Sequence, residues 1–209
     1  MLNYSGYNIG CFTTPFVQSF LGPVGVVTTC LFDAGNSLLS TGGTYSLAAS
    51  YLGKGRTNAG AFFKKIFSSV PFVTYLVMLA LSILHLSVPA PVTVFTGTVG
   101  AANSFLAMLM IGLGLEWNMP KGKGIRIGKA LLVRYSAAAI LALLLFFCTP
   151  FSLEVRQVLA LVAMSPIASL AVVFTEKCDG DIAMASTINS LSIMISVLIM
   201  TGMILAMGV

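Results

Sequence analysis

Uncharged and mostly apolar runs make up most of the chain. A membrane-spanning helix needs about 20 mainly apolar residues, whereas a strand of a membrane β-barrel alternates apolar and polar positions over about 10 residues. Stretches such as residues 137–147 (AAAILALLLFF) do not alternate, so the pattern predicts helices. The charge-free runs are 1–32, 34–53, 66–115, 135–153, 157–175 and 182–209.

Prolines divide two of these runs. Pro23 interrupts the first run and Pro89 and Pro91 interrupt the third, because proline lacks the N–H that a helix interior requires. The pattern therefore predicts an all-helical integral membrane protein in which residues 53–67 form a basic loop. The seven expected helices are 4–21, 24–52, 68–87, 92–115, 128–149, 155–175 and 182–207.

Composition and charge narrow the class of protein. The chain is 57% hydrophobic and 8% charged, whereas a soluble domain is about a quarter charged. This excludes a soluble enzyme, a nucleic-acid-binding domain and a disordered protein. Ten of the eleven Lys and Arg residues fall on one side of the seven helices, if Arg134 is counted as a loop flank, and only Arg156 falls on the other. The positive-inside rule then predicts a multi-pass inner-membrane protein with a cytoplasmic N-terminus and an external C-terminus.

Groups that carry enzymatic chemistry are scarce. His85 is the only histidine, which excludes HExxH, bis-histidine haem and Ser–His sites. The cysteines at positions 11, 30, 148 and 178 lie far apart and show no CxxC spacing. The sequence therefore predicts no enzymatic activity, no cofactor and no metal site.

Asp33 is an acidic residue inside the expected helix 24–52. An ionisable group at bilayer depth is costly and usually has a function. With Asn36 as a nearby hydrogen-bonding partner, Asp33 is a candidate for coupling transport to an ion. A structural role in a glycine-rich packing helix explains the residue equally well.

Two of the expected helices are interrupted near their middles. The first contains Asn8 and Pro15 (NIGCFTTP), and the sixth contains Ser165 and Pro166 (AMSPIAS). Proline frees backbone groups that hydrocarbon tolerates only against protein or a water-filled cavity. Freed amides and half-helix N-termini attract an anion, and Asn8 adds a side-chain amide. Each interruption taken alone is also compatible with an ordinary proline kink.

The placement of the two interruptions indicates an inverted repeat. Residues 68–209 hold five helices, of which the fourth is broken. The broken helix 4–21 is likewise followed by one long helix, so residues 1–52 correspond to the last two helices of an earlier five-helix set. Because five is odd, the two sets have opposite orientations, as in many secondary transporters. This interpretation also expects three helices before Met1.

The sequence around the first interruption resembles that of the auxin efflux carrier family, which includes plant auxin exporters and bacterial organic-anion permeases. In that family the fourth helix carries an Asn followed by a Pro seven residues later, and Asn8 and Pro15 keep this spacing. Gly10 matches the NxG of bacterial members, whereas Thr13 and Thr14 replace the usual Gly-Ile. Similar segments occur around Pro166, at Val172-Val173-Phe174, at Ser186-Thr187 and at residues 107–113.

The resemblance covers the chain as the last seven of ten helices and implies a site where the fourth and ninth helices cross. It implies that Asn8 faces the carboxylate of a substrate, with Gly10 beside it, and that Pro15 and Pro166 hold the crossover open. Ser165 adjoins the same position. Substrates of the family are small organic acids, for example malonate or malate, which are moved by alternating access.

The sequence therefore predicts a secondary transporter for a small organic anion. Asn103, in the middle of the expected helix 92–115, either faces the substrate cavity or makes an interhelical hydrogen bond. Ser186, Asn189 and Ser190 line the same region or join helices. The sequence predicts neither whether the coupling ion is a proton or sodium nor whether the protein forms a homodimer. The alternative is a channel-like or structural membrane subunit, or an inactive remnant, that needs a partner chain.

Overall fold

The computed structural model describes residues 6–37, 39–40, 44, 67, 70–113 and 122–208, and these residues are helical apart from turns and short connections. No strand occurs among them, so the predicted all-helical class is confirmed for the described part of the chain. The elements are η2 (Ile9–Thr13), α1 (Thr14–Phe20), α2 (Pro23–Ser37), α5 (Val70–Ile83), α6 (Ala90–Leu113), α7 (Gly124–Cys148), α8 (Leu153–Ala163), α9 (Leu170–Lys177) and α10 (Ile182–Met207).

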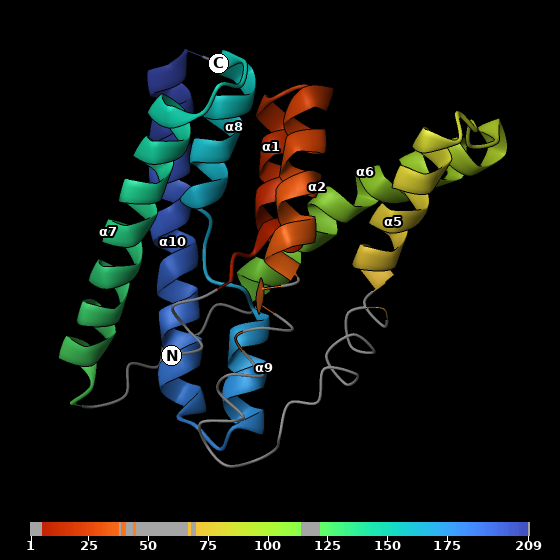
Figure 1. Cartoon of the computed structure of the whole chain (residues 1–209). Coiled ribbons are helices and arrows are strands. Elements are labelled where there is room, and N and C mark those ends of the chain that lie inside the picture. The colour runs from red at the N-terminus through yellow and green to blue at the C-terminus, as the bar shows by residue number, and fades with distance from the viewer. Residues whose placement is uncertain are drawn as a thin grey trace.

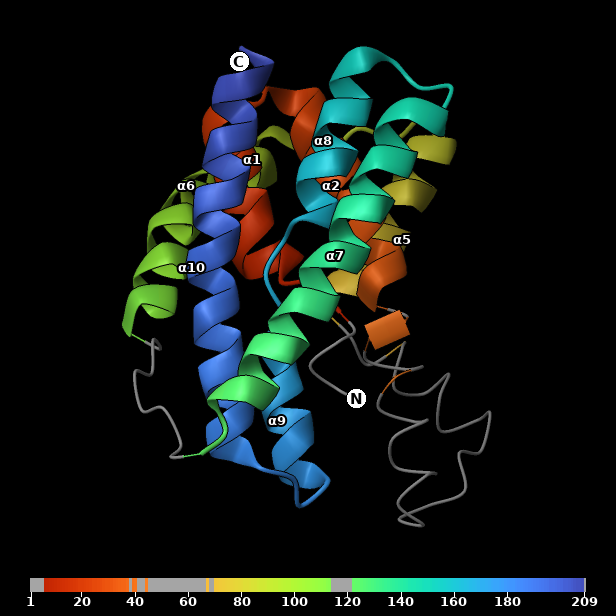
Figure 2. The same ribbon diagram turned by 90° about the vertical axis from the view of Figure 1, so that its left-hand side faces the viewer.

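Helices α7, α8 and α10 lie beside the pair formed by α1 and α2 (Figures 1 and 2). Helix α8 contacts both α7 and α2, so it occupies the middle of this arrangement. Helix α6 begins beside the end of α5 and runs obliquely toward α1 and η2, which it contacts, while α5 contacts α2 (Figure 1). Helix α8 therefore lies between α2, from the N-terminal part of the chain, and α7, from the C-terminal part.

Helices α7 and α10 are long and apolar enough to cross a membrane, judged by length and composition. Side chains such as Leu132, Leu143 and Phe147 on α7 and Leu198 on α10 are exposed, as expected for surfaces that face lipid. The bounds of α10 agree with the expected helix 182–207. Helix α7 begins at Gly124, four residues before the expected start.

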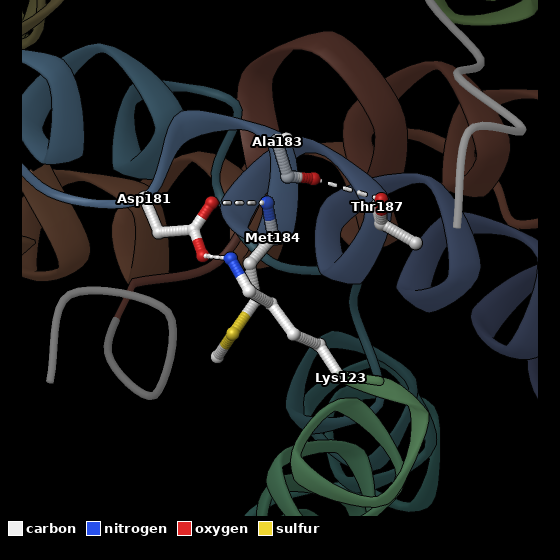
Figure 3. Close-up of polar contacts among 5 residues, drawn as sticks. All are labelled: Lys123, Asp181, Ala183, Met184 and Thr187. Carbon is white, nitrogen blue, oxygen red and sulfur yellow. Dashed lines mark hydrogen bonds and ion pairs between the residues drawn. The ribbon is translucent and has the colours of Figure 1, made fainter. Parts of the chain in front are cut away.

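Polar contacts fix the ends of α7 and α10 at one side of the molecule. Asp181 is the N-cap of α10, and its side chain accepts a hydrogen bond of 3.1 Å from the backbone N–H of Met184. Its other carboxylate oxygen is ion-paired with Lys123, the residue before α7 (Figure 3). The hydrogen bonds from Lys123 and Met184 lower the pKa of the Asp181 carboxyl, so the carboxylate stays charged at neutral pH.

Two of the expected helices are broken more completely than the sequence predicts. The expected helix 155–175 is two helices, α8 and α9, separated by the non-helical residues 164–169. Pro166 lies in this gap because it can neither donate a backbone hydrogen bond nor let the preceding residue adopt a helical conformation easily. The expected helix 4–21 is non-helical at residues 6–8, continues as the π-helix η2 and becomes α-helical only at Thr14.

The other expected helices are seen in part. Helix α2 covers the start of the expected helix 24–52, whose remainder lies almost wholly outside the described residues, as does the basic loop 53–67. Helices α5 and α6 correspond to the expected helices 68–87 and 92–115. The count of seven membrane helices and the inverted repeat stay predictions.

The largest core joins the two broken segments. Buried side chains of η2 and α1 pack against those of α8 and α10. Val17, Val158, Leu161 and Met200 are completely buried there. The members are Ile9, Phe12, Phe16, Val17, Leu21, Val158, Leu161, Val162, Ile193, Met200 and Ile204.

Candidate functional site: the crossing of two broken helices

The two interrupted segments lie against each other. Tyr7 and Ile167 form an isolated antiparallel bridge, and the backbone N–H of Asn8 donates to the carbonyl oxygen of Pro166 over 2.9 Å. A proline has no N–H of its own, but its carbonyl accepts in the usual way. The Asn8 N–H and the Pro166 carbonyl have no partner within their own interrupted helices, and here they bond each other.

Side chains add two more contacts at this crossing. The Asn8 amide nitrogen Nδ2 donates to Ser169 Oγ at 3.2 Å, and Thr13 Oγ1 lies 2.6 Å from Ser165 Oγ. Thr13 and Ser165 are almost fully buried, and Asn8 is 6% exposed. Three predicted site residues, Asn8, Ser165 and Pro166, therefore meet although more than 150 positions separate them in the sequence.

The remaining predicted site residues lie around this crossing or elsewhere. Pro15 is fully buried in the first turn of α1. Gly10 lies in η2 next to Asp33, because a Cβ added to Gly10 would lie 3.8 Å from Asp33 Oδ2. Asn103 belongs to α6, which contacts η2, but its side chain is outside the described part of the structure, so its role stays a prediction.

Asn36 holds the first broken segment from the side opposite to Pro166. Its Oδ1 accepts from the Tyr7 N–H, and its Nδ2 donates to the Tyr7 carbonyl, both at 3.0 Å. The same Nδ2 lies 3.1 Å from Oδ1 of Asp33, which is buried. A side-chain amide thereby pairs with the backbone as a neighbouring strand would, and it links the candidate coupling residue to the crossing.

Helices α7 and α10 brace the second broken segment. Ser196 Oγ donates to the carbonyl of Met164 at 2.8 Å, and the N–H of Ile167 donates to Ser192 Oγ at 3.2 Å. Tyr135 Oη, on α7, lies 2.6 Å from the Ser192 carbonyl and 2.8 Å from Ser196 Oγ. The Ser192 and Ser196 hydroxyls thus bond backbone groups that the gap between α8 and α9 frees, and Tyr135 bonds α10 at the same two residues.

Sequence reasoning did not find the two α10 hydroxyls that bond the gap, those of Ser192 and Ser196. It singled out Ser186, Asn189 and Ser190, whose role in lining the crossing or joining helices stays a prediction. The spacing of four between Ser192 and Ser196 places both on one face of the helix. That spacing was visible in the sequence, but which face meets the gap depends on how α10 is rotated.

Arg134, which the charge pattern predicts at the flank of a cytoplasmic loop, is a buried residue in the structure. It lies inside α7 and is only 6% exposed. Its Nη2 donates to the Gly6 carbonyl at 3.1 Å, and its guanidinium carbon lies 4.3 Å from the centre of the Tyr7 ring. The available signal was that position 134 already lay within the expected helix 128–149.

A cavity of about 470 Å³ opens beside the crossing. Its walls combine apolar side chains of α2 with polar groups and the Arg134 guanidinium. The lining residues are Gly6, Tyr7, Leu31, Phe32, Gly35, Asn36, Leu39, Ser40, Thr44 and Arg134. Within the described residues no group of three or more His, Cys, Asp or Glu is placed to hold a metal ion. The site thus offers amides, hydroxyls and one guanidinium, which are groups that bind anions.

Comparison with protein-family models, with curated proteins and with solved structures finds no match to this chain. The assignment of function therefore depends on the residues and contacts of the crossing.

The contact between Thr13 and Ser165 gives a direct test of the crossing. We expect Thr13→Val and Ser165→Ala each to lower the free energy of unfolding by about 1–2 kcal/mol. Thr13→Val removes the donor to the buried Ser165 hydroxyl, and Ser165→Ala leaves the Thr13 hydroxyl only its longer contact of 3.3 Å with the Asn8 carbonyl. The double variant should lose about 1 kcal/mol less than the sum of the two, and a double-mutant cycle of unfolding in mixed micelles measures this difference.

Thr175→Val supplies the control for this cycle, because its hydroxyl bonds only the Ala171 carbonyl of its own helix. Combined with Thr13→Val it should be additive. Additivity of the Thr13 and Ser165 variants would contradict the contact.

Proposed function

We propose that this chain is a secondary transporter of the inner membrane that moves a small organic anion, such as a carboxylate, by alternating access at the crossing of its two broken helices. In this proposal the chain crosses the bilayer several times, with a cytoplasmic N-terminus and an external C-terminus. It is not an enzyme and acts on no nucleic acid.

The observation that supports the proposal most strongly is the hydrogen-bonded contact between residues 6–8 and residues 164–169. Non-helical backbone at membrane depth occurs where it is buried in protein or lines a cavity. Substrate sites of secondary transporters are typically formed by discontinuous helices that meet near the middle of the bilayer. Here two interrupted helices meet at one place, beside a cavity lined in part by the Arg134 guanidinium, which is the arrangement that the proposal requires.

Two further features agree with a carrier. The resemblance of Asn8 and Pro15 to the auxin efflux carrier motif implies an amide that faces a carboxylate at this crossing. Asp33 is buried next to Gly10 and is hydrogen-bonded to Asn36, which holds the first broken segment. We therefore assign coupling to a proton or sodium ion to Asp33, since a change in its charge would act directly on that segment.

The test is counterflow in proteoliposomes loaded with unlabelled malonate, with entry of labelled malonate as the readout. A carrier gives saturable, transient accumulation. We expect Asn8→Ala to raise KM about tenfold, because an amide hydrogen bond to a charged group contributes about 1.5 kcal/mol or more. Thr149→Val is the control, since its hydroxyl bonds the Leu145 carbonyl at the far end of α7 and KM should not change.

Three outcomes would contradict the proposal. Unchanged KM in Asn8→Ala would remove the amide from the anion site. Flux that rises linearly with concentration and shows no counterflow would favour a channel. Absence of flux for malonate, malate and simple monocarboxylates would exclude an organic-anion carrier formed by this chain.

A further inference from the structure

Tyr135 joins α7 to the face of α10 that braces the second broken segment. Its Oη lies 2.6 Å from the carbonyl oxygen of Ser192 and 2.8 Å from Oγ of Ser196. Ser196 Oγ in turn donates to the carbonyl of Met164 at 2.8 Å. Both serines are fully buried, and Tyr135 is partly buried. A line of hydroxyl contacts therefore runs from α7 across α10 to the first non-helical residue after α8.

These three contacts share two hydrogens. Tyr135 and Ser196 have one hydroxyl hydrogen each, and the carbonyls of Ser192 and Met164 can only accept. When both hydroxyls donate to carbonyls, no hydrogen is left between the two hydroxyl oxygens. When Ser196 instead donates to Tyr135 Oη, the carbonyl of Met164 loses its side-chain donor. The geometry thus allows two arrangements that differ by a rotation of the Ser196 hydroxyl.

The neighbouring contact at Ser192 has a single arrangement. Ser192 Oγ accepts from the N–H of Ile167 at 3.2 Å and donates to the carbonyl of Asn189 at 2.7 Å. The amide hydrogen of Ile167 has a fixed direction, and the hydroxyl hydrogen of Ser192 is used within α10. The second broken segment is therefore held in one way at Ile167 and in an exchangeable way at Met164.

The exchangeable contact lies where the helix stops. Met164 is the C-cap of α8, and its carbonyl would accept from the N–H of residue 168 if the helix continued. Ser196 supplies a donor in place of that amide. A crossing that changes shape in each transport cycle must release and regain such contacts. A buried hydroxyl that loses its acceptor is costly, so a second acceptor within reach lowers the cost of release.

We propose that Tyr135 is a positioning residue of transport. Its hydroxyl oxygen offers the Ser196 hydrogen an alternative acceptor, so that the Met164 end of the second broken segment is released while Ile167 stays bonded. This inference rests on the proposed transport function and goes beyond it by naming a residue that acts on the crossing through Ser196.

Counterflow of labelled malonate in proteoliposomes containing the full chain tests the inference. We expect Tyr135→Phe to lower the maximal rate by about fivefold to tenfold, the factor that corresponds to one hydrogen bond. KM should not change, because Asn8 and Ser169 keep their contact. A variant that merely distorted the crossing would change KM as well.

The decisive comparison combines Tyr135→Phe with Ser196→Ala. Without the Ser196 hydrogen there is nothing to exchange, so Tyr135→Phe should have no further effect on the maximal rate in this background. Ser192→Ala is the matched control on the same helix. It keeps the Ser196 hydrogen, so Tyr135→Phe should lower the rate there by the same factor as in the wild type.

A second variant keeps the test decisive if Ser196→Ala does not fold. Ser196→Cys has a similar size but only a weak S–H donor, so the effect of Tyr135→Phe should become smaller in this background.

The outcomes separate this inference from the proposed function. If the wild-type chain shows no counterflow, both fail. If it shows counterflow and Tyr135→Phe lowers the rate by the same factor in the Ser196 and Ser192 variants, Tyr135 has only a structural role and the inference alone is overturned. An unchanged rate in Tyr135→Phe, or a raised KM, would overturn it as well.

Discussion

Asn36→Leu is expected to lower the free energy of unfolding by about 3–5 kcal/mol, although leucine has the same number and branching of side-chain heavy atoms as asparagine. The substitution leaves both the N–H and the carbonyl of Tyr7 without their side-chain partner. Each such buried group costs about 1–3 kcal/mol, and more where no water can replace the partner. Unfolding of the variant in mixed micelles, compared with the wild type, measures the loss.

Thr28→Val is the matched control on the same helix. Its hydroxyl bonds the Val24 carbonyl within α2, a local contact that contributes little to stability, so we expect a change below about 0.5 kcal/mol. Asn36→Asp should be intermediate, because it keeps an acceptor for the Tyr7 N–H but loses the donor. Equal losses in Asn36→Leu and Thr28→Val would show that the Tyr7 pairing is dispensable.

Gly25→Val is expected to lower the free energy of unfolding by about 3 kcal/mol. Gly25 lies at the start of α2, where a Cβ would approach Leu21 Cβ to 2.9 Å and Val17 Cγ1 to 3.0 Å, with Val158 of α8 at 3.5 Å. The nearest of these atoms is attached directly to the backbone, so α1 and α2 must shift to make room. Overpacking of this kind typically costs 1–3 kcal/mol and sometimes more.

Gly35→Val is the control for the same chemical change on the same helix, because a Cβ at Gly35 meets no atom within 4 Å. Its effect should stay within about 0.5 kcal/mol of the wild type. The difference between the two variants, measured under the same unfolding conditions, isolates the contact of α2 with its neighbours. A difference below about 1 kcal/mol would contradict close packing at Gly25.

The broken helices could be predicted from the sequence because their cause is local. Pro166 cannot be accommodated in a helix interior, and it ends α8 wherever the neighbouring helices lie. The comparison of the two halves of the chain predicted that the two broken helices cross, but not the hydrogen bond of Asn8 with Pro166. The π-helical turn at Ile9–Thr13 could not be predicted, since it depends on where residues 6–8 are held by distant partners.

Other parts of the site depend on how the helices are rotated about their axes, which the sequence pattern defines poorly. The apolar residues of α10 surround the whole helix, so nothing in the pattern marks Ser192 and Ser196 as the face toward the gap. Arg134 was misassigned because a basic residue close to a loop is usually solvated. The expected helix 128–149 already contained position 134, but its burial results from the position of α7 next to Gly6 and Tyr7, which the helix pattern does not give.

The crossing also sets an order on the synthesis of the chain. Asn8 and Thr13 leave the ribosome before their partners near Ser165, which follow more than 150 residues later. During that interval the Asn8 N–H lacks its partner, the Pro166 carbonyl. Asn36 follows Tyr7 by only 29 residues, so the side of residues 6–8 that Asn36 bonds can be completed long before the side that faces Pro166.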